Sequence, residues 1–243
     1  MNLRTNIFFT CCALLLVTCR GTTAQPRLSL QSQSQVTGLG ESFVSQNVEV
    51  NGTSLHYVRG GSGPAVILLH GFPEDWYEFH KIMPPLAQQF TVVAVDLRGV
   101  GESTPAPSGY DAANLAKDIY ELTQRLNLEH PYIFGHDVGG MVAYAYARLY
   151  PQTVRGVMIL DAPLPGLPPW EKILDDPLVW HIRFHQADNL ADRLVAGRQK
   201  IYFRYFLRPE TFSDADVEHY VHAYRDPDHL RVAFEFYRAF PAN

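Results

Sequence analysis

Four short, uninterrupted apolar runs, separated by segments with helical patterning, constrain the fold of this chain more than any other feature. The runs occupy residues 65–69 (AVILL), 91–95 (TVVAV), 132–134 (YIF) and 157–160 (VMIL). A run without polar alternation is typical of a strand that is buried on both faces. Because strands that alternate with helices form parallel sheets, the sequence predicts an α/β protein with a mostly parallel sheet.

The remaining pattern supports this prediction. Helices are expected at 77–90, with an interruption at Pro84-Pro85, at 112–126 and at 139–150. Before the first run, apolar alternation on both sides of Asn51-Gly52 predicts a β-hairpin made by residues 48–50 and 55–58.

The first 24 residues have the order of a secretory signal peptide. Arg4 gives a positive start, an apolar run covers residues 7–19, and small residues lead to Ala24. The run is too short to span a bilayer comfortably, so no stable membrane insertion is expected after cleavage. The mature protein is expected to be secreted or periplasmic. An uncleaved interfacial anchor and a lipoprotein attached at Cys19 are the alternatives.

Composition excludes several function classes. All three cysteines lie in the first 24 residues, so the mature chain would have none, which excludes cysteine catalysis and thiolate metal sites. The formal net charge is −5 and no basic block is present, so neither nucleic acid nor an anionic membrane surface is an expected partner. The sequence shows no metal-ligand cluster and no dinucleotide fingerprint, so neither a metal nor a cofactor is expected. An oligomer remains possible.

The strand pattern stops after residue 161. Four prolines, at positions 163, 165, 168 and 169, open a helical and aromatic segment that continues to residue 243. The predicted organisation is a signal peptide at 1–24, a core at 25–161 and a helical lid at 162–243. The polar stretch 29–40 is expected to be a flexible lead-in to the core.

A short motif joins the third apolar run to the helix that follows it. Gly135-His136-Asp137-Val138-Gly139 has the pattern small-x-nucleophile-x-small, which resembles the nucleophile elbow of α/β-hydrolases. The turn is so sharp that glycine is needed at Gly135 and Gly139 if strand and helix are to approach closely. Serine usually occupies the central position, but here it is Asp137, whose charge the helix N-terminus favours. The alternative is a glycine-rich turn in which Asp137 only caps the helix.

An aspartate nucleophile restricts the substrate. A carboxylate that attacks an acyl carbonyl gives an anhydride, which gains little over the starting ester. Attack on a saturated carbon gives an alkyl ester, which water can then cleave. The expected partner is therefore a small-molecule epoxide or a related alkyl electrophile such as an alkyl halide, and not an ester or a peptide.

The loop His70-Gly71-Phe72-Pro73 directly follows the first apolar run. In an α/β-hydrolase this loop supplies one backbone amide of the oxyanion hole, and the residue after the nucleophile supplies the other. The two donors would be the amides of Phe72 and Val138, and they would stabilise the oxyanion that forms when water attacks the ester. The alternative is a simple Gly-Pro turn.

Asp161 directly follows the fourth apolar run, at the carboxyl end of a predicted central strand. Functional side chains gather at this edge in open α/β sheets. Asp161 is therefore predicted to orient a catalytic histidine, and the alternative is that it caps the turn into the lid.

Together these residues resemble the epoxide hydrolase and dehalogenase branch of the α/β-hydrolases, over about residues 48–241. The resemblance to secreted bacterial epoxide hydrolases of the Cif type lies in HGFPEDWYEFHK (70–81), TVVAVD (91–96), LVWH (178–181) and FEFYRAF (234–240). It implies that His181 and Tyr237 donate hydrogen bonds to the epoxide oxygen and so stabilise the alkoxide as its charge develops. The alternative for both is packing within the lid. Members of this branch carry glutamate where this chain has Asp161, which is a modest departure.

The dehalogenase alternative fits less well. Haloalkane dehalogenases place a tryptophan directly after the nucleophile, where this chain has Val138. Fluoroacetate dehalogenases place arginines just after the nucleophile, where this chain has Val138 and Met141, and a tryptophan after the lid histidine, where it has Ile182. These departures concern the halide and carboxylate contacts, so an epoxide is the preferred substrate.

The third catalytic element of this fold is a histidine on a loop after the last strand. Five histidines follow Asp161, at positions 181, 185, 219, 222 and 229, and all lie in the predicted lid. The resemblance implies further strands, so the first six strands of the α/β-hydrolase fold are expected to be present and the last ones absent, as in a fragment. Three hypotheses follow: an epoxide hydrolase without its last portion, a dehalogenase of the same branch, and a catalytically dead hydrolase-fold binding protein.

Overall fold

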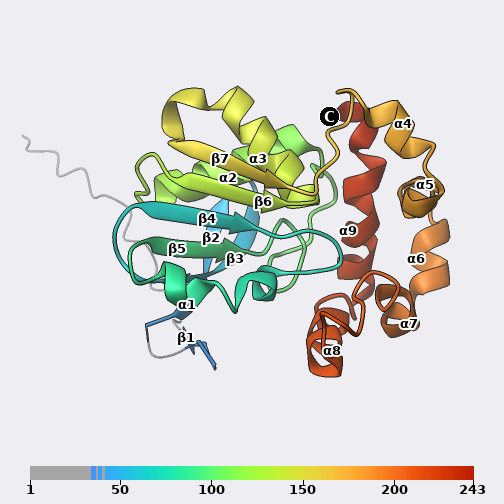
Figure 1. Ribbon diagram of the computed structural model, residues 1–243, viewed down its shortest axis with the longest axis horizontal. Helices are drawn as coiled ribbons and strands as arrows, with labels where there is room; N and C mark the ends of the chain where they lie inside the picture. Colours follow the sequence, from blue (N-terminus) through green and yellow to red (C-terminus); the bar gives the residue numbers. More distant parts are fainter. Residues whose placement is uncertain (1–33, 37, 40–41) are drawn as a thin grey trace, which may run out of the picture. The chain divides into compact units, whose positions relative to one another are not determined.

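The computed structural model describes residues 34–36, 38–39 and 42–243, and the predicted signal peptide lies outside them. The described residues form a seven-stranded mixed sheet in the order β1-β2-β3-β5-β4-β6-β7 (Figure 1). The strands are β1 (Ser34–Gln35), β2 (Val44–Val50), β3 (Thr53–Gly60), β4 (Ala65–Leu69), β5 (Thr91–Val95), β6 (Tyr132–His136) and β7 (Gly156–Leu160).

The four apolar runs form the parallel part of the sheet, as predicted. β4 pairs in parallel with β5 and β6, and β7 pairs in parallel with β6. β2 and β3 make the predicted antiparallel hairpin, and β3 pairs antiparallel with β5. One difference lies in the predicted flexible lead-in, where Ser34 and Gln35 pair with β2 and form the short strand β1.

Two helices follow their predicted segments closely, α2 (Ala112–Arg125) and α3 (Val138–Leu149), and they pack against each other. The helix expected at 77–90 is wrong in extent: it consists of the 3-10 helix η1 (Trp76–Phe79) and the single turn α1 (Met83–Leu86). Pro84 and Pro85 lie in the first turn of α1, where a missing N–H breaks no hydrogen bond. The prolines therefore begin this helix and do not interrupt it.

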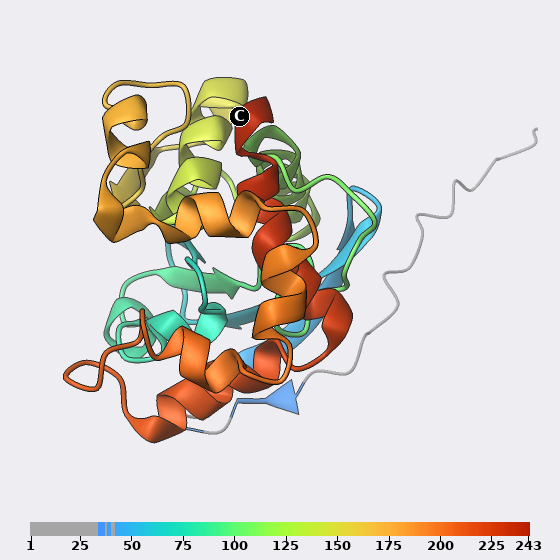
Figure 2. The same ribbon diagram turned by 90° about the vertical axis from the view of Figure 1, so that its right-hand side faces the viewer.

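Only helices and turns follow β7 within the described residues. The α-helices after β7 are α4 (Trp170–Leu174), α5 (His181–Gln186), α6 (Leu190–Val195), α7 (Gln199–Phe203), α8 (Asp214–Ala223) and α9 (Pro227–Arg238). The 3-10 helices after β7 are η3 (Pro177–Val179) and η4 (Phe240–Ala242), and another, η2 (Pro151–Thr153), lies between α3 and β7. Figure 1 shows α9 beside the ends of the parallel strands, toward which the arrowheads of β4 and β6 point. The turned view of Figure 2 shows the helices α5–α7, in shades of orange, arranged around α9 in red, and α5 and α6 contact α9. Among the helices described, none combines the length and the apolar character that a membrane span requires.

α9 turns an apolar face toward the interior. Leu230, Phe234 and Tyr237, spaced four and three residues apart, are each no more than 3% exposed. Asp226 begins the helix, and its side chain accepts a hydrogen bond from the amide of Asp228. The sequence therefore places Tyr237 on the face of α9 that looks toward the sheet.

β7 is an open edge of the sheet in the described part of the chain. It pairs with β6 on one side only, and the side chains of Val157, Met158 and Leu160 are 40%, 61% and 46% exposed. An apolar groove with a volume of about 730 Å³ runs beside this edge, lined by residues that include Val66, Leu68, Phe90, Tyr132, Val157 and Met158.

Two buried ion pairs fix the loops at the carboxyl ends of the central strands. Arg98 lies 2.6 Å from Asp118 of α2 and also donates to the carbonyl of Asn51 at 3.0 Å. His56 of β3 lies 2.8 Å from Asp96, which directly follows β5. These pairs hold together the end of the sheet at which the candidate site lies.

Candidate active site

Asp137 occupies a strained turn between β6 and α3. Its backbone has φ 48° and ψ −117°, which a residue other than glycine rarely adopts. A β-carbon at Gly135 would collide with the carbonyl of Gly139, and one at Gly139 would collide with the carbonyl of Leu69. The two glycines therefore allow strand, helix and the end of β4 to approach closely, which is the backbone geometry of a nucleophile elbow.

The carboxylate of Asp137 faces the backbone amide of Phe72, which donates to Oδ2 over 3.0 Å. Burial raises the pKa of Asp137, while hydrogen bonds from the amides of Phe72 and Val138 and the nearby charge of His136 act in the opposite direction. The two amides predicted for the oxyanion hole thus converge on this carboxylate. A charge that develops on one of its oxygens would meet donors that are already in place.

His70 fixes the loop that carries the Phe72 amide. Its Nε2 accepts from the amide of Leu97 at 3.0 Å, so Nδ1 carries the proton and donates to the carbonyl of Gly71 at 2.9 Å. Pro73 follows through a cis peptide bond. The imidazole of His70 is 1% exposed, so its role is to connect this loop with the end of β5 inside the core.

His181 in α5 and Tyr237 in α9 lie on the lid side of the same site. Their ring centroids are 6.2 Å apart, and the ring of Tyr237 lies 5.7 Å from that of Phe72. Burial lowers the pKa of His181 to about 4, and its Nδ1 is buried without a hydrogen-bond partner in the described part of the chain. Burial, reinforced by the charge of Asp137, raises the pKa of Tyr237 well above its usual value, so the phenol keeps its proton.

A second lid histidine, His185, was not predicted and lies closer to Tyr237 than His181 does. Its ring centroid is 4.3 Å from that of Tyr237, and Nε2 lies 2.6 Å from the hydroxyl of Tyr202. Burial holds the pKa of His185 well below its usual value and raises that of Tyr202, so the hydroxyl donates to a neutral imidazole. The spacing of four residues after His181, on one face of α5, was the signal available in the sequence.

Three titratable residues beside Asp137 were also not predicted. Nδ1 of His136 lies 3.1 Å from a carboxylate oxygen of Glu78 and 3.5 Å from one of Glu74. The three groups each offer one atom within 4.8 Å of the others, close enough to share a cation. The short N–O separations are those of direct ion pairs, however, so the imidazole already fills the space between the two carboxylates.

Asp161 stands apart from these groups. The amide of Asp137 donates to the carbonyl of Leu160 at 3.0 Å, which brings the backbone of Asp161 next to the nucleophile turn. Its side chain is exposed, and within the described residues no hydrogen bond or ion pair to its carboxylate is found. The predicted role of Asp161 in orienting a histidine stays a prediction.

Two cavities lie between the core and the lid. The cavity beside the nucleophile turn has a volume of about 400 Å³, and its lining includes Phe72, Glu74, His136, His181, Phe206 and Phe212. It combines apolar walls with neutral and charged polar groups, as a small-molecule site does. Phe72, His136 and His181 line this cavity, whereas Asp137 and Tyr237 do not, so it lies next to the strained turn; we take it as the candidate substrate site.

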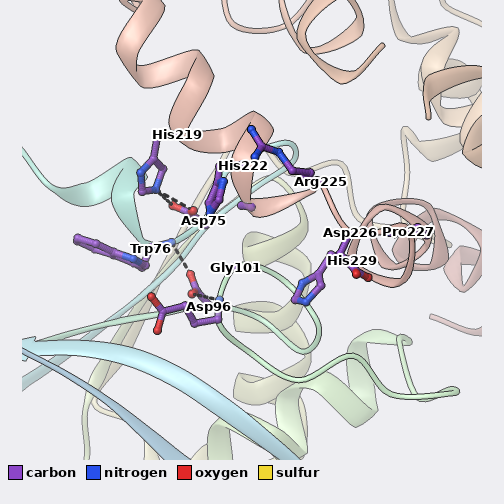
Figure 3. A pocket seen from close by; sticks show the side chains of 12 residues that line it. Asp75, Trp76, Asp96, Gly101, His219, His222, Arg225, Asp226, Pro227 and His229 are labelled. Carbon is purple, nitrogen blue, oxygen red and sulfur yellow. Dashed lines mark hydrogen bonds and ion pairs between the residues drawn. The ribbon is translucent and has the colours of Figure 1, made fainter. Parts of the chain in front are cut away.

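The other cavity, of about 540 Å³, lies between η1, the loop after β5 and the helices α8 and α9 (Figure 3). Its central polar groups are already paired with each other: His219 with Asp75, and the amide of Trp76 with Asp96. None of Phe72, His136 and His181 lines it, so a molecule bound in this cavity would lie away from the groups that surround Asp137.

Residues 64–222 match a family model described as alpha/beta hydrolase fold. The chain is 36% identical over 199 residues to the soluble epoxide hydrolase of Corynebacterium sp. (strain C12), an alignment that covers 77% of this chain and 69% of that enzyme. It is 31% identical over 215 residues to a fluoroacetate dehalogenase of Burkholderia sp., covering 82% of this chain and 70% of the dehalogenase.

Solved structures show the same similarity. Cfl2 from Burkholderia cenocepacia superposes with a TM-score of 0.80 at 37% identity, over 87% of this chain and 76% of its own. The Cif epoxide hydrolase from Acinetobacter nosocomialis superposes with a TM-score of 0.75 at 25% identity, over 84% of this chain and 67% of its own. The resemblance expected from the sequence motifs is therefore confirmed.

Proposed function

The chain belongs to the alpha/beta hydrolase fold family, in its epoxide hydrolase and dehalogenase branch, and on that premise we propose that it opens epoxides through a covalent ester on Asp137 to give diols. The observation that carries the proposal is the contact between the Asp137 carboxylate and the Phe72 amide at a strained turn. An aspartate at this position can attack a saturated carbon and become an alkyl ester. The backbone amides beside its oxygens can then stabilise the oxyanion that forms when water hydrolyses the ester.

In the first step, an oxygen of Asp137 attacks one epoxide carbon and the bond from that carbon to the ring oxygen breaks. His181 and Tyr237 donate hydrogen bonds to the departing oxygen, which takes the phenol proton of Tyr237 and becomes a hydroxyl. The proton released when the ester is hydrolysed in the second step restores the phenol. Both groups are neutral donors because burial disfavours their charged forms. Neutral donors stabilise the alkoxide as it forms and place no fixed charge against an uncharged substrate.

In the second step, water attacks the carbonyl carbon of the Asp137 ester. The negative charge then lies on the carbonyl oxygen, where the amides of Phe72 and Val138 stabilise it, and collapse releases the diol and restores the carboxylate. This step needs a general base. We propose that the base is a histidine oriented by Asp161. None of the five lid histidines is proposed for this role.

Two alternatives make different predictions for the same site. Similarity to a fluoroacetate dehalogenase supports a dehalogenase of the same branch, but Val138 and Met141 offer no cation to a substrate carboxylate. A catalytically dead hydrolase-fold protein would bind small molecules without forming the ester. In each case the partner is a small molecule, and the predicted signal peptide supports an extracytoplasmic location.

The experiment that tests the proposal is intact-mass analysis after incubation with a small aryl or alkyl epoxide. We expect a mass increase equal to one epoxide, located at Asp137 by peptide mapping, and no increase in Asp137→Asn. Parallel incubation with fluoroacetate should release no fluoride. Labelling at another residue, or none in the wild type with every epoxide tried, would refute the nucleophile assignment, and fluoride release would favour the dehalogenase.

A further inference from the structure

A cluster of three ionisable side chains lies beside Asp137, and the two proposed steps do not use it. His136 ends β6 immediately before Asp137, whereas Glu74 and Glu78 come from the segment that follows the oxyanion loop. The separations of 3.1 and 3.5 Å from His136 to the two carboxylates join segments that are about 60 residues apart in sequence. The sequence around Asp137 alone does not predict that Glu74 and Glu78 pair with His136.

Glu78 makes a second contact, with the oxyanion loop itself. Its Oε2 accepts from the amide of Gly71 at 3.1 Å, while its Oε1 faces His136. The next amide along the loop, that of Phe72, is the one that donates to Asp137. The contacts therefore form a closed ring that runs from Glu78 through the loop to the nucleophile and back through His136.

The loop is packed tightly onto this ring. A β-carbon at Gly71 would come within 2.7 Å of the β-carbon of Asp137 and 3.0 Å of Nδ1 of His136. Only glycine leaves room for the loop at this distance, so a small shift of the loop changes the contact between Phe72 and Asp137 directly. A group that holds both sides at once is needed if the geometry is to persist.

We propose that Glu78 is a positioning residue for the alkylation step: it holds the Phe72 amide and Asp137 in register by binding Gly71 with one carboxylate oxygen and His136 with the other. The inference rests on the proposed function of Asp137. It deepens that function because it names the side chain that sets the geometry in which the nucleophile and its oxyanion donor meet. The contact with Gly71 is a hydrogen bond to a carboxylate, among the stronger ones in proteins, and the contact with His136 is an ion pair at 3.1 Å.

The electrostatics of the cluster agree with the geometry. Burial acts to lower the pKa of His136, but the two carboxylates outweigh it and raise the value to about 11, so the imidazole is a cation at neutral pH. Burial raises the pKa of Glu74 to about 7. The cation next to Asp137 opposes the effect of burial on the nucleophile and helps it to stay ionised.

Three variants of Glu78 separate the effect of its bridge, meaning its simultaneous contacts with Gly71 and His136, from the effect of its charge. Glu78→Ala removes both contacts. Glu78→Asp keeps the charge on a shorter side chain that cannot reach Gly71 and His136 together. Glu78→Gln keeps the length and both contacts without the charge, because its oxygen accepts from Gly71 and its NH2 group can donate to Nδ1 of a neutral His136. Glu218→Ala is the matched control, because Glu218 lies on α8 and pairs with exposed Lys200 away from the site.

Two measurements are made on each variant: the rate constant for ester formation with an epoxide, followed by intact mass, and hydrogen exchange of the amides of Gly71 and Phe72. We expect Glu78→Ala and Glu78→Asp each to slow ester formation at least tenfold and to speed amide exchange at least tenfold. Glu78→Gln should keep the protection and stay within about threefold of the wild-type rate, and Glu218→Ala within twofold. If Glu78→Ala does not fold, Glu78→Asp against Glu78→Gln decides the question.

Wild-type rate and protection in Glu78→Asp would overturn the inference, as would a lost rate with unchanged exchange. If the wild type forms no ester at all, the proposed function fails. The exchange data then stand alone: faster exchange in Glu78→Asp supports the bridge, and unchanged exchange refutes it.

Discussion

Nε2 of His219 in α8 lies 2.9 Å from Oδ2 of Asp75, three residues after Phe72 (Figure 3). The ring of His219 also stacks on that of Tyr77, with centroids 4.2 Å apart. Burial acts to lower the pKa of His219, but the hydrogen bond and the charge of Asp75 outweigh it and raise the value. The lid is thereby attached to the core beside the oxyanion loop by a pair whose strength depends on pH.

We expect α8 to be held more firmly in mild acid than in mild alkali. The folded-state pKa is raised, so the stabilisation is fully present below the unfolded value of about 6.5 and is lost as the pH rises through the folded value. His219 is partly exposed, so the effect should be below about 1 kcal/mol. Hydrogen exchange of the α8 peptide at pH 6 and 8.5, corrected for intrinsic rates, measures it. His219→Gln should abolish the difference and His222→Gln should preserve it; an unchanged difference in His219→Gln would disprove the role of the pair.

Tyr237→Phe should slow ester formation roughly a hundredfold, the usual effect of removing one donor to a developing oxyanion. In the proposed mechanism the hydroxyl serves only ring opening, so decay of the isolated Asp137 ester should change by much less. Both rates can be followed by quenched intact mass. Tyr120→Phe, on α2 and stacked on Tyr150, is the control and should leave both rates unchanged. Equal slowing of the two steps would show that Tyr237 only packs against Phe72.

Gly139→Ala should destabilise the fold by about 3 kcal/mol, because the new methyl group would meet the carbonyl of Leu69, which cannot move without displacing β4. Gly156→Ala is the matched control. A β-carbon there finds only ordinary contacts of 3.4 Å or more with Tyr132, so its effect should stay within about 0.5 kcal/mol. Chemical denaturation of both variants gives the comparison, and similar stabilities would contradict the close packing inferred at the elbow.

The open edge at β7 should promote self-association, because an exposed apolar strand offers unpaired backbone groups to a second chain. Met158→Lys should reduce it, since Met158 is 61% exposed on this edge. Ile201→Lys places the same charge at a position that is 77% exposed in the lid and should have no effect. Static light scattering across a concentration series tests the pair. Equal scattering by the wild type and Met158→Lys would place the association elsewhere.

The parallel strands could be predicted from the sequence because their side chains are buried on both faces, which leaves an unbroken apolar run for each. The segment 77–90 could not, because Pro84 and Pro85 are compatible both with the end of a helix and with its first turn. Only the packing of Met83 and Phe79 into the core decides between the two, and packing is not visible in local sequence.

The sharp turn at Asp137 and its approach to the loop of Phe72 could be predicted because they depend on backbone shape, which glycine marks directly. His136, Glu78 and His185 were missed for the opposite reason. Their partners are distant in sequence, and a lone histidine or glutamate carries no local mark of the group that it will meet. Asp161 is a different case: its place directly after β7 predicts a histidine partner, its side chain is exposed in the structure, and its role stays a prediction.

The turn at residue 137 also bears on how this chain can change over evolutionary time. Its amide is bound by Leu160, and its shape is set by Gly135 and Gly139, while the side chain of Asp137 caps no helix. The shape of the turn and the chemical reactivity of its central side chain are therefore determined by different residues. In the proposed mechanism, a substitution at residue 137 alone would exchange the attacking atom, while the glycines and the hydrogen bond that shape the turn stay in place.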